Sequence, residues 1–183
     1  MEAEKPDNMH DSFEFSCHKE IWTCRDGRTV ILRSITSADK SIEKELIDGL
    51  SFESSTYRFF HAIKEANEDM VNQFCDIDHK NEIAVIAEYN SIDKKRNVGV
   101  IRIYIDPGLQ TGEFAILVTD NFQNSGLGTK FMEILLDLGR KKGLKSIFGV
   151  VLTDNNRMLT LAKEFGFIIG LPSTGEVRIT LQL

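Results

Sequence analysis

The chain has 183 residues, of which 42% are hydrophobic and 27% charged, and its formal net charge is −6. This size and apolar content suit one folded domain with its own core, and they exclude a collagen-like, low-complexity or disordered chain. The acidic balance argues against a large nucleic-acid-binding surface. No apolar run approaches the roughly 18 residues of a membrane-spanning helix, and the acidic N-terminus lacks the apolar stretch of a signal peptide.

Cysteine and histidine are sparse. The three cysteines, Cys17, Cys24 and Cys75, are too few for a disulfide framework, and the four histidines share no spacing typical of metal ligands. We therefore expect a metal-free protein of the reducing cytoplasm. Residues 1–20 carry six acidic and two basic side chains, which predicts a flexible acidic tail ahead of a single domain over residues 21–183.

The first half of that domain reads as a hairpin followed by helices. Asp26-Gly27 lies between two apolar runs, as in a tight hairpin turn. Thr36 and Asp39 form a plausible capping box for a helix reaching about Leu50. Two further helical stretches are expected, over residues 51–66 and 67–75.

The second half predicts a sheet interrupted by two helices. Three runs rich in Val, Ile and Tyr suggest consecutive antiparallel strands, at 82–89, 98–105 and 113–119. A helix over 126–142, a strand over 145–152 and a helix over 154–165 follow, with strands over 167–170 and 176–181 at the end. The order of elements indicates a mixed α/β domain.

The most informative segment joins a strand to a helix. After Thr119 the sequence Gln123-Asn124-Ser125-Gly126-Leu127-Gly128 begins an amphipathic helix. Unpaired N–H groups and the helix dipole favour an anion there, glycines allow its close approach, and Lys130 adds a positive charge. The spacing fits neither a P-loop nor a dinucleotide-binding fingerprint. Two interpretations remain: a diphosphate-binding loop, or a glycine-rich helix cap without a ligand.

The pattern Gln123-x-x-Gly126-x-Gly128 resembles motif A of the GNAT superfamily of N-acetyltransferases. Asp154-Asn155-Asn156-Arg157-Met158, followed by Glu164-Phe165-Gly166-Phe167, is similar to the next motif of that superfamily. The resemblance covers about residues 28–183. It implies the acyl-CoA N-acyltransferase fold, a mixed but mostly antiparallel twisted sheet flanked by helices, with acetyl-CoA as co-substrate.

A narrower resemblance points to bacterial protein-lysine acetyltransferases that act on acyl-CoA synthetases. The sequences that carry it are Arg58-Phe59-Phe60, Gly99-Val100-Ile101-Arg102, Gly112-Glu113-Phe114-Ala115, and the pattern from Met158-Leu159 to Gly166-Phe167. Arg58 itself has two interpretations: a stem packed over core aromatics, or a side chain facing the substrate.

The superfamily resemblance assigns residues to the donor. It implies that the pyrophosphate is held by the loop Gln123, Asn124, Ser125, Gly126, Leu127, Gly128 and Thr129. It places the pantetheine against the main chain of Ile116 and Val118, where an N–H could also stabilise the oxyanion. Asn155 would lie near the pantetheine or the sulfur, or would only cap the following helix.

Glu113 is the candidate catalytic base. Partial burial beside Gly112 and Phe114 would make this carboxylate a stronger base, and the resembled protein acetyltransferases use a Glu at the matching position. The alternative is a solvated carboxylate at a strand end. Many superfamily members carry a Tyr acid seven residues after the Asn, but here that position is Ala162. The thiolate would then leave without a side-chain acid, or take its proton from water.

The sequence thus predicts an acetyl-CoA-dependent N-acetyltransferase, in which an amine attacks the thioester in a ternary complex. A protein lysine is the first acceptor considered. A small-molecule amine or amino acid is the second, and a non-catalytic acyl-CoA sensor is the third. No nucleic-acid or membrane partner is expected. A homodimer through the alternating Val177, Ile179, Leu181 and Leu183 is one interpretation of the C-terminal strand, and a core-lining role is the other.

Overall fold

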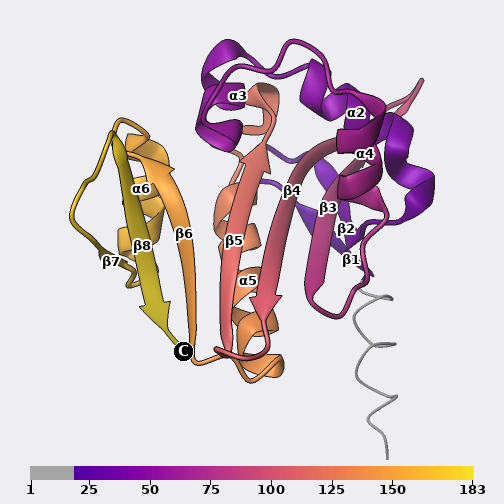
Figure 1. Ribbon diagram of the computed structural model, residues 1–183. Coiled ribbons are helices and arrows are strands. Elements are labelled where there is room, and N and C mark those ends of the chain that lie inside the picture. Colours follow the sequence, from indigo (N-terminus) through magenta and orange to yellow (C-terminus); the bar gives the residue numbers. More distant parts are fainter. Residues whose placement is uncertain (1–18) are drawn as a thin grey trace, which may run out of the picture.

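The computed structural model describes residues 19–183, whose centre is one eight-stranded sheet of order β1-β2-β3-β4-β5-β6-β8-β7 (Figure 1). All neighbouring strands are antiparallel except β5 and β6, which are parallel. The strands are β1 (Lys19–Thr23), β2 (Thr29–Ser34), β3 (Glu82–Asn90), β4 (Lys95–Asp106), β5 (Thr111–Val118), β6 (Ser146–Leu152), β7 (Ile168–Ile169) and β8 (Glu176–Gln182). This confirms the predicted mixed, mostly antiparallel architecture.

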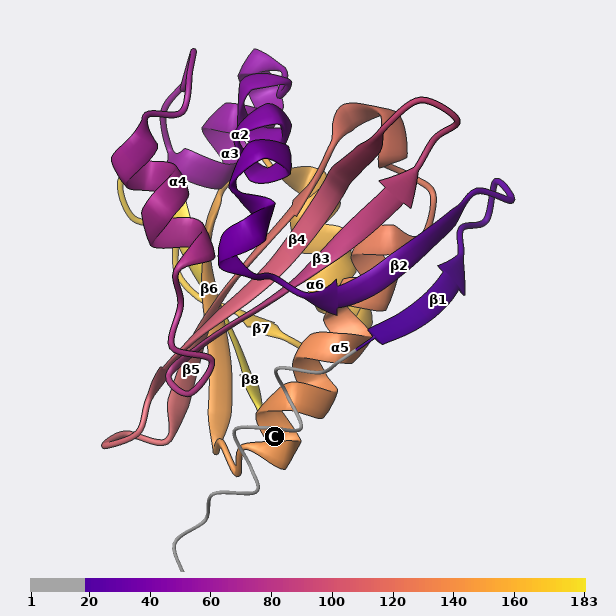
Figure 2. The same cartoon turned by 90° about the vertical axis from the view of Figure 1, so that its right-hand side faces the viewer.

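Helices cover both faces of the sheet. The N-terminal group lies on one face and α5 lies on the other (Figure 2). The helices are η1 (Ser37–Asp39), α2 (Lys40–Asp48), α3 (Phe52–Phe59), α4 (Glu68–Cys75), η2 (Asp120–Phe122), α5 (Leu127–Lys141) and α6 (Asn156–Glu164). No helix within residues 19–183 is long and apolar enough to cross a membrane.

Two hydrophobic clusters hold these layers together. The larger lies between the sheet and the helices α5 and α6, and includes Phe131 and Leu135 of α5 with Ile147 of β6, all fully buried. The smaller lies beneath α2 and α4, where Ile47 packs with Ile86. Alternation along the strands sends successive side chains into one cluster and then the other. Each helix therefore needs only one apolar face, as the sequence pattern indicates.

Most of the predicted elements are confirmed, including the hairpin around Asp26-Gly27 and the three-stranded meander. The helix expected over 51–66 was too long. It ends at Phe59 because Phe60 adopts a left-handed conformation (φ 62°) and the N–H of Ile63 turns back to donate to Ser55 Oγ at 2.8 Å. The strand expected over 167–170 shortens to Ile168–Ile169. Most of the expected tail, with Cys17, lies outside the described residues.

The feature that positions the site is the divergence of β5 from β6. The two strands pair only at three positions, Thr111 with Ser146, Gly112 with Ile147 and Glu113 with Phe148. Beyond Glu113, β5 remains paired with β4 and β6 remains paired with β8, but not with each other. The sheet therefore opens into a wedge whose walls are two strand edges.

Candidate functional site

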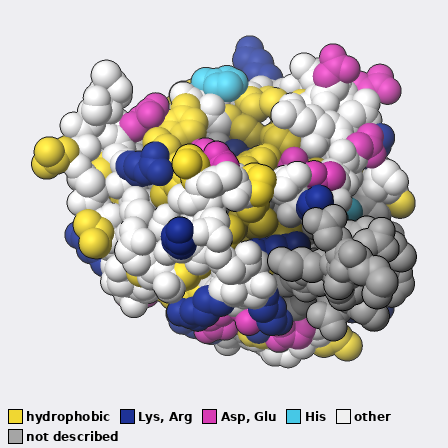
Figure 3. Space-filling model, turned by 60° about the horizontal axis from the view of Figure 1, so that its bottom comes forward, with side chains coloured by type: hydrophobic (Ala, Val, Ile, Leu, Met, Phe, Trp, Pro, Cys, Tyr) yellow, Lys and Arg dark blue, Asp and Glu magenta, His cyan; other side chains and the backbone are white. Residues whose placement is uncertain are grey.

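The wedge is part of a cavity of about 660 Å³. Its walls come from α3, from β5 with the following loop, and from β6 with the start of α6. Residues 115–118 and Gly149–Val151 line it from the two strand edges. Figure 3 shows hydrophobic side chains gathered in a hollow in the middle of one molecular face. A cavity of this size, mostly apolar with a few polar groups, is typical of a small-molecule site.

The edge of β5 offers main-chain hydrogen-bonding groups to this cavity. The N–H of Thr119 donates to the carbonyl of Val98 at 3.0 Å, so Thr119 and alternate residues before it face β4. The N–H and C=O groups of Ile116 and Val118 therefore face the opposite way, into the wedge. An extended ligand can pair with them as an additional strand would.

The loop between β5 and α5 provides a second set of donors. Among the described residues, the N–H groups of Asn124, Gly126, Gly128 and Thr129 have no hydrogen-bond acceptor. Gly126 takes φ 88°, a left-handed conformation that glycine adopts without strain, and directly precedes α5. The unpaired donors and the positive end of the helix dipole form an anion site next to the wedge.

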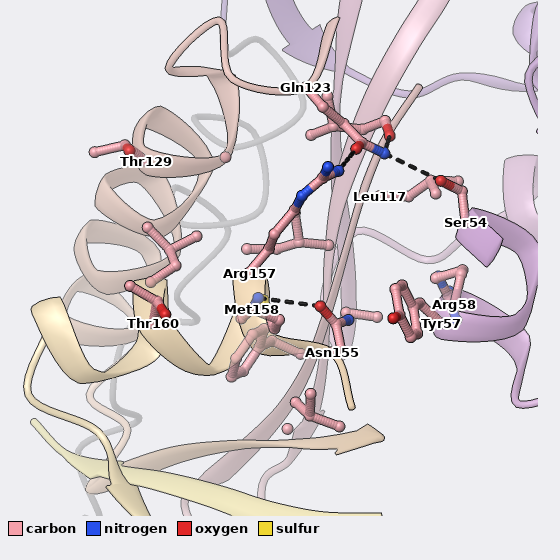
Figure 4. Close-up of a pocket in the computed structure, with 18 of the residues that line it drawn as sticks. Ser54, Tyr57, Arg58, Leu117, Gln123, Thr129, Asn155, Arg157, Met158 and Thr160 are labelled. Carbon is pink, nitrogen blue, oxygen red and sulfur yellow. Dashed lines mark hydrogen bonds between the residues drawn. The ribbon is translucent and has the colours of Figure 1, made fainter. Parts of the chain in front are cut away.

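The side chain of Gln123 links three walls of the cavity (Figure 4). Its Nε2 donates to Ser54 Oγ of α3 at 3.0 Å and lies 3.4 Å from the carbonyl of Val118. Its Oε1 accepts a hydrogen bond from the Arg157 guanidinium of α6. Gln123 and Arg157 therefore bridge the wedge in this conformation and lie on the path of a ligand paired with β5.

Asn155 and Tyr57 face each other across the middle of the cavity (Figure 4). The Oδ1 of Asn155 accepts from the N–H of Met158 at 3.1 Å, so the helix-cap interpretation is confirmed. The Tyr57 hydroxyl has two acceptors for its one proton, a carboxylate oxygen of Glu53 at 3.2 Å and the carbonyl of Asp154 at 3.4 Å. Desolvation and the carboxylates of Asp154 and Glu53 raise the pKa of Tyr57, so this phenol keeps its proton.

Glu113 lines the cavity where the strands separate. It is exposed, and not partly buried as the sequence suggested. Alternation along β5 places Glu113 on the opposite face of the sheet from Phe114, which is buried in the larger cluster. The cross-strand neighbour of Glu113 is Tyr104 of β4. Burial raises the pKa of the Tyr104 phenol, which therefore stays neutral beside the carboxylate.

Behind this end of the cavity lies a buried ionic network. Arg102, which is 1% exposed, donates to Glu82 at 2.8 Å and to the Phe74 carbonyl at 2.8 Å, and its guanidinium lies 3.4 Å from Glu43. Asn97 donates to the other oxygen of Glu43 at 2.7 Å. Burial raises the pKa of Glu43 despite these partners. The network fixes β4 against α2 and α4, and so fixes the wall that carries Phe74.

Arg58 has features of both interpretations made from the sequence. Its guanidinium carbon lies 5.0 Å from the ring centroid of Phe59 and 5.8 Å from that of Phe74, so the stem does pack over aromatics. It also lines the cavity beside Tyr104, and burial lowers its pKa. Within residues 19–183 it forms no ion pair.

The chain is similar in sequence to known acetyltransferases. A family model described as the acetyltransferase (GNAT) family matches residues 48–167. The chain belongs to this family. Acetyltransferase PA5475 of Pseudomonas aeruginosa is 30% identical over 143 residues, which are 78% of this chain and 77% of that protein.

Solved structures with the same fold agree. The GNAT domain of S. lividans PAT superposes with a TM-score of 0.80 at 25% identity, covering 90% of this chain and 97% of that one. A spermidine N-acetyltransferase from Vibrio cholerae, solved with CoA and spermine, gives 0.67 at 18% identity, covering 84% and 95%; it shares the fold. The family supports N-acetyl transfer from acyl-CoA, and the open edge and anion loop of this GNAT chain fit an acyl-CoA molecule.

The remaining predicted site residues divide in two. Gln123, Asn124, Gly126, Gly128 and Thr129 line the cavity, whereas Ser125 and Leu127 are buried beneath it. Lys130 does not reach the loop, because it pairs with Glu20 of β1 at 2.8 Å. Ala162 is fully buried in the core. Val177 and Ile179 are buried in the larger cluster, while Leu181 and Leu183 pack against it, so the core-lining interpretation holds.

Sequence reasoning gave no role to many of the residues that line the cavity of the GNAT chain, among them Arg25, Tyr57 and Arg157. Arg25 and Tyr57 lie far from the two motifs in the sequence, and only tertiary folding brings them to the cavity. The described residues contain no group of three or more His, Cys, Asp or Glu side chains placed to hold a metal ion.

Proposed function

We propose that the protein transfers the acetyl group of acetyl-CoA to a primary amine, with a protein lysine, on an acyl-CoA synthetase, as the first acceptor to test. The observation that carries the donor part is the wedge between β5 and β6, in which main-chain groups of β5 without a strand partner continue into unpaired donors of the loop. A pantetheine arm that ends in a diphosphate needs its hydrogen-bonding partners in this order, main-chain groups along the arm and then donors at the phosphates. The free thiols of Cys24 and Cys75 suit a reducing, cytoplasmic setting.

The residues assigned to the donor keep their proposed roles. The loop 123–129 holds the diphosphate, Ile116 and Val118 pair with the pantetheine, and Asn155 orients the arm from the opposite wall. Gln123 and Arg157 must separate to admit the donor, since their contact crosses the wedge. A main-chain N–H of β5 is then available to the thioester oxygen as negative charge develops there.

The transfer step needs a base and a leaving group. The amine nitrogen attacks the thioester carbon, and Glu113 takes the proton that the nitrogen loses, directly or through one water. The carbon–sulfur bond breaks with its electron pair on sulfur, and CoA leaves as the thiolate or is protonated by water. Ala162 supplies no acid. The exposure of Glu113 leaves it accessible to an amine arriving from solvent.

The acceptor end suits an ammonium group on an apolar stem. Glu53 of α3, Glu113 of β5 and Glu164 of α6 are exposed carboxylates that line the cavity, which Phe60 and Phe74 also line. The narrower sequence resemblance and the likeness to the PAT domain support a protein lysine. Arg58 favours the second candidate, a small amine that carries a carboxylate, because its guanidinium lacks an ion-pair partner among the described residues.

The test begins with thermal shift. A ligand at about 100 times its Kd stabilises the native state by about 2.7 kcal/mol, so acetyl-CoA and CoA should raise the unfolding temperature and ATP should not. Thiol release is then measured with lysine peptides, whole acyl-CoA synthetase and a panel of small amines. We expect Glu113→Gln to lower kcat by roughly 10²- to 10⁴-fold and to leave the CoA shift intact.

Each contrary result removes a defined part of the proposal. No shift at millimolar acetyl-CoA would remove the donor assignment. A shift without turnover of any amine, equal in wild type and Glu113→Gln, would identify an acyl-CoA sensor. Turnover of small amines alone would exclude the protein lysine.

A further inference from the structure

We infer that Arg25, in the turn between β1 and β2, is a phosphate-binding residue that contacts the diphosphate of CoA. The inference rests on the proposed use of CoA as donor and adds a ligand contact from outside the strand–loop–helix segment.

The turn is fixed onto the β5–α5 loop by several contacts. The N–H of Arg25 donates to the carbonyl of Ser125 at 2.8 Å. Arg28 Nη2 donates to the carbonyl of Asn121 at 2.8 Å, and the Arg28 guanidinium lies 3.6 Å from the ring centroid of Phe122. Cys24 and Ser125 are both buried at this junction. The position of Arg25 relative to the loop is therefore set by the fold.

Arg25 is an available cation on the loop side of the cavity. Arg28 pairs with Asp26 at 2.5 Å, and Lys130 pairs with Glu20 at 2.8 Å. Arg157 lies on α6, on the opposite wall of the wedge from the loop, and reaches Gln123 only across the wedge. Arg25, by contrast, is exposed, lines the cavity and forms no ion pair with any residue of the described range 19–183.

The side chain lies directly against the unpaired loop donors. A Cβ placed on Gly126 would be 3.1 Å from Arg25 Nε and 3.2 Å from its Cγ, so the stem of Arg25 crosses over Gly126. The N–H groups of Gly126, Gly128 and Thr129, all without acceptors in the described chain, lie in the same part of the cavity. An anion held by these donors is within reach of the guanidinium.

The chemistry favours a phosphate. A guanidinium presents planar paired donors that match two oxygens of one phosphate group, and charge-assisted hydrogen bonds of this kind are the strong ones. CoA carries two phosphate groups that could be bound, the diphosphate and the 3′-phosphate. We assign the diphosphate, because the main-chain donors at Gly126 and the Arg25 side chain converge on one place.

Isothermal titration of CoA and of dephospho-CoA, which lacks the 3′-phosphate, tests the assignment. The variants are Arg25→Met, which keeps the stem, and Arg140→Met, a control that removes an exposed charge near the other end of α5. For Arg25→Met we expect affinity for both ligands to fall by the same factor, on the order of 10- to 100-fold. Arg140→Met should match wild type, and unliganded unfolding temperatures should be alike in all three proteins.

Steady-state kinetics gives a second readout. Arg25→Met should raise KM for acetyl-CoA and leave kcat within about twofold, since a diphosphate contact is the same in ground and transition states. Loss confined to CoA would move Arg25 to the 3′-phosphate and overturn the assignment. Unchanged affinity for both ligands would overturn it entirely. Absence of CoA binding by the wild type would instead refute the proposed function.

Discussion

Replacing Gly126 with alanine tests the donor loop most directly. Gly126 has φ 88°, where an L-residue costs about 1–2 kcal/mol, and a Cβ there would approach Arg25 to 3.1 Å. In a chain of this length each kcal/mol lowers the unfolding temperature by roughly 2–4 °C, so we expect a decrease of about 2–8 °C. The added methyl group also displaces the Arg25 stem and covers the loop donors, so CoA affinity should fall at least about tenfold.

Gly143→Ala is the matched control. Gly143 follows the other end of α5, has φ 66°, and a Cβ placed there meets no atom within 4 Å. Both variants should lose similar stability in urea unfolding, whereas only Gly126→Ala should lose CoA affinity in isothermal titration. Equal CoA affinity in the two variants would refute the reasoning, and so would a Gly126→Ala protein as stable as wild type.

Three further predictions concern acid stability, thiol reactivity and packing. Burial raises the pKa of Asp39, but hydrogen bonds from Arg33 and Thr36 prevail and lower the pKa below the usual 3.8, so the stability that this carboxylate gives at neutral pH declines as pH falls below 3.8. Asp39→Asn should therefore be less stable than wild type at pH 7, and its urea midpoint should depend less on pH. An unaltered pH dependence of the midpoint would contradict this. Burial raises the pKa of Cys24 and raises that of Cys75 to about 12. Mass spectrometry after alkylation at pH 8 should therefore find neither thiol labelled until the protein is unfolded. Labelling of either thiol in the native protein would refute the burial argument. A Cβ on Gly112 would lie 2.6 Å from a neighbouring side-chain carbon, so Gly112→Ala should cost about 1–3 kcal/mol by urea unfolding, and a neutral result would show that the sheet can relax there.

Local signals predicted the elements well because those elements are determined by nearby residues. Asp26-Gly27 specifies a tight turn whatever surrounds it, and the apolar spacing of α5 specifies its buried face. The end of α3 was different. Residues 60–66 have a composition compatible with a helix. However, Phe60 adopts a left-handed conformation, and the N–H of Ile63 donates a hydrogen bond to Ser55 Oγ, eight positions earlier in the chain. The insertion of β8 between β6 and β7 likewise depends on long-range pairing.

The functional site was likewise predictable from the sequence only where it depends on nearby residues. The loop around Gly126 was visible in the sequence because its donors are main-chain groups, whose positions follow from a strand, a turn and a helix. The environment of a side chain was not visible. Glu113 is exposed on the face of the sheet opposite Phe114, and Lys130 is drawn away by Glu20, about 110 residues earlier in the chain. Arg25 could have been suggested only by pairing the hairpin with the loop, which no local pattern encodes.

The three-residue junction of β5 with β6 has a consequence for amide hydrogen exchange. Strand pairing joins the two blocks of the sheet only at Thr111–Glu113, and the outward N–H groups of Ile116 and Val118 have no strand partner. These amides should exchange rapidly with deuterium although they sit in the middle of an eight-stranded sheet, while their neighbours facing β4 exchange slowly. A donor paired along this edge would act as a temporary ninth strand and slow that exchange. Protection of these two amides would then report occupancy without any need for turnover.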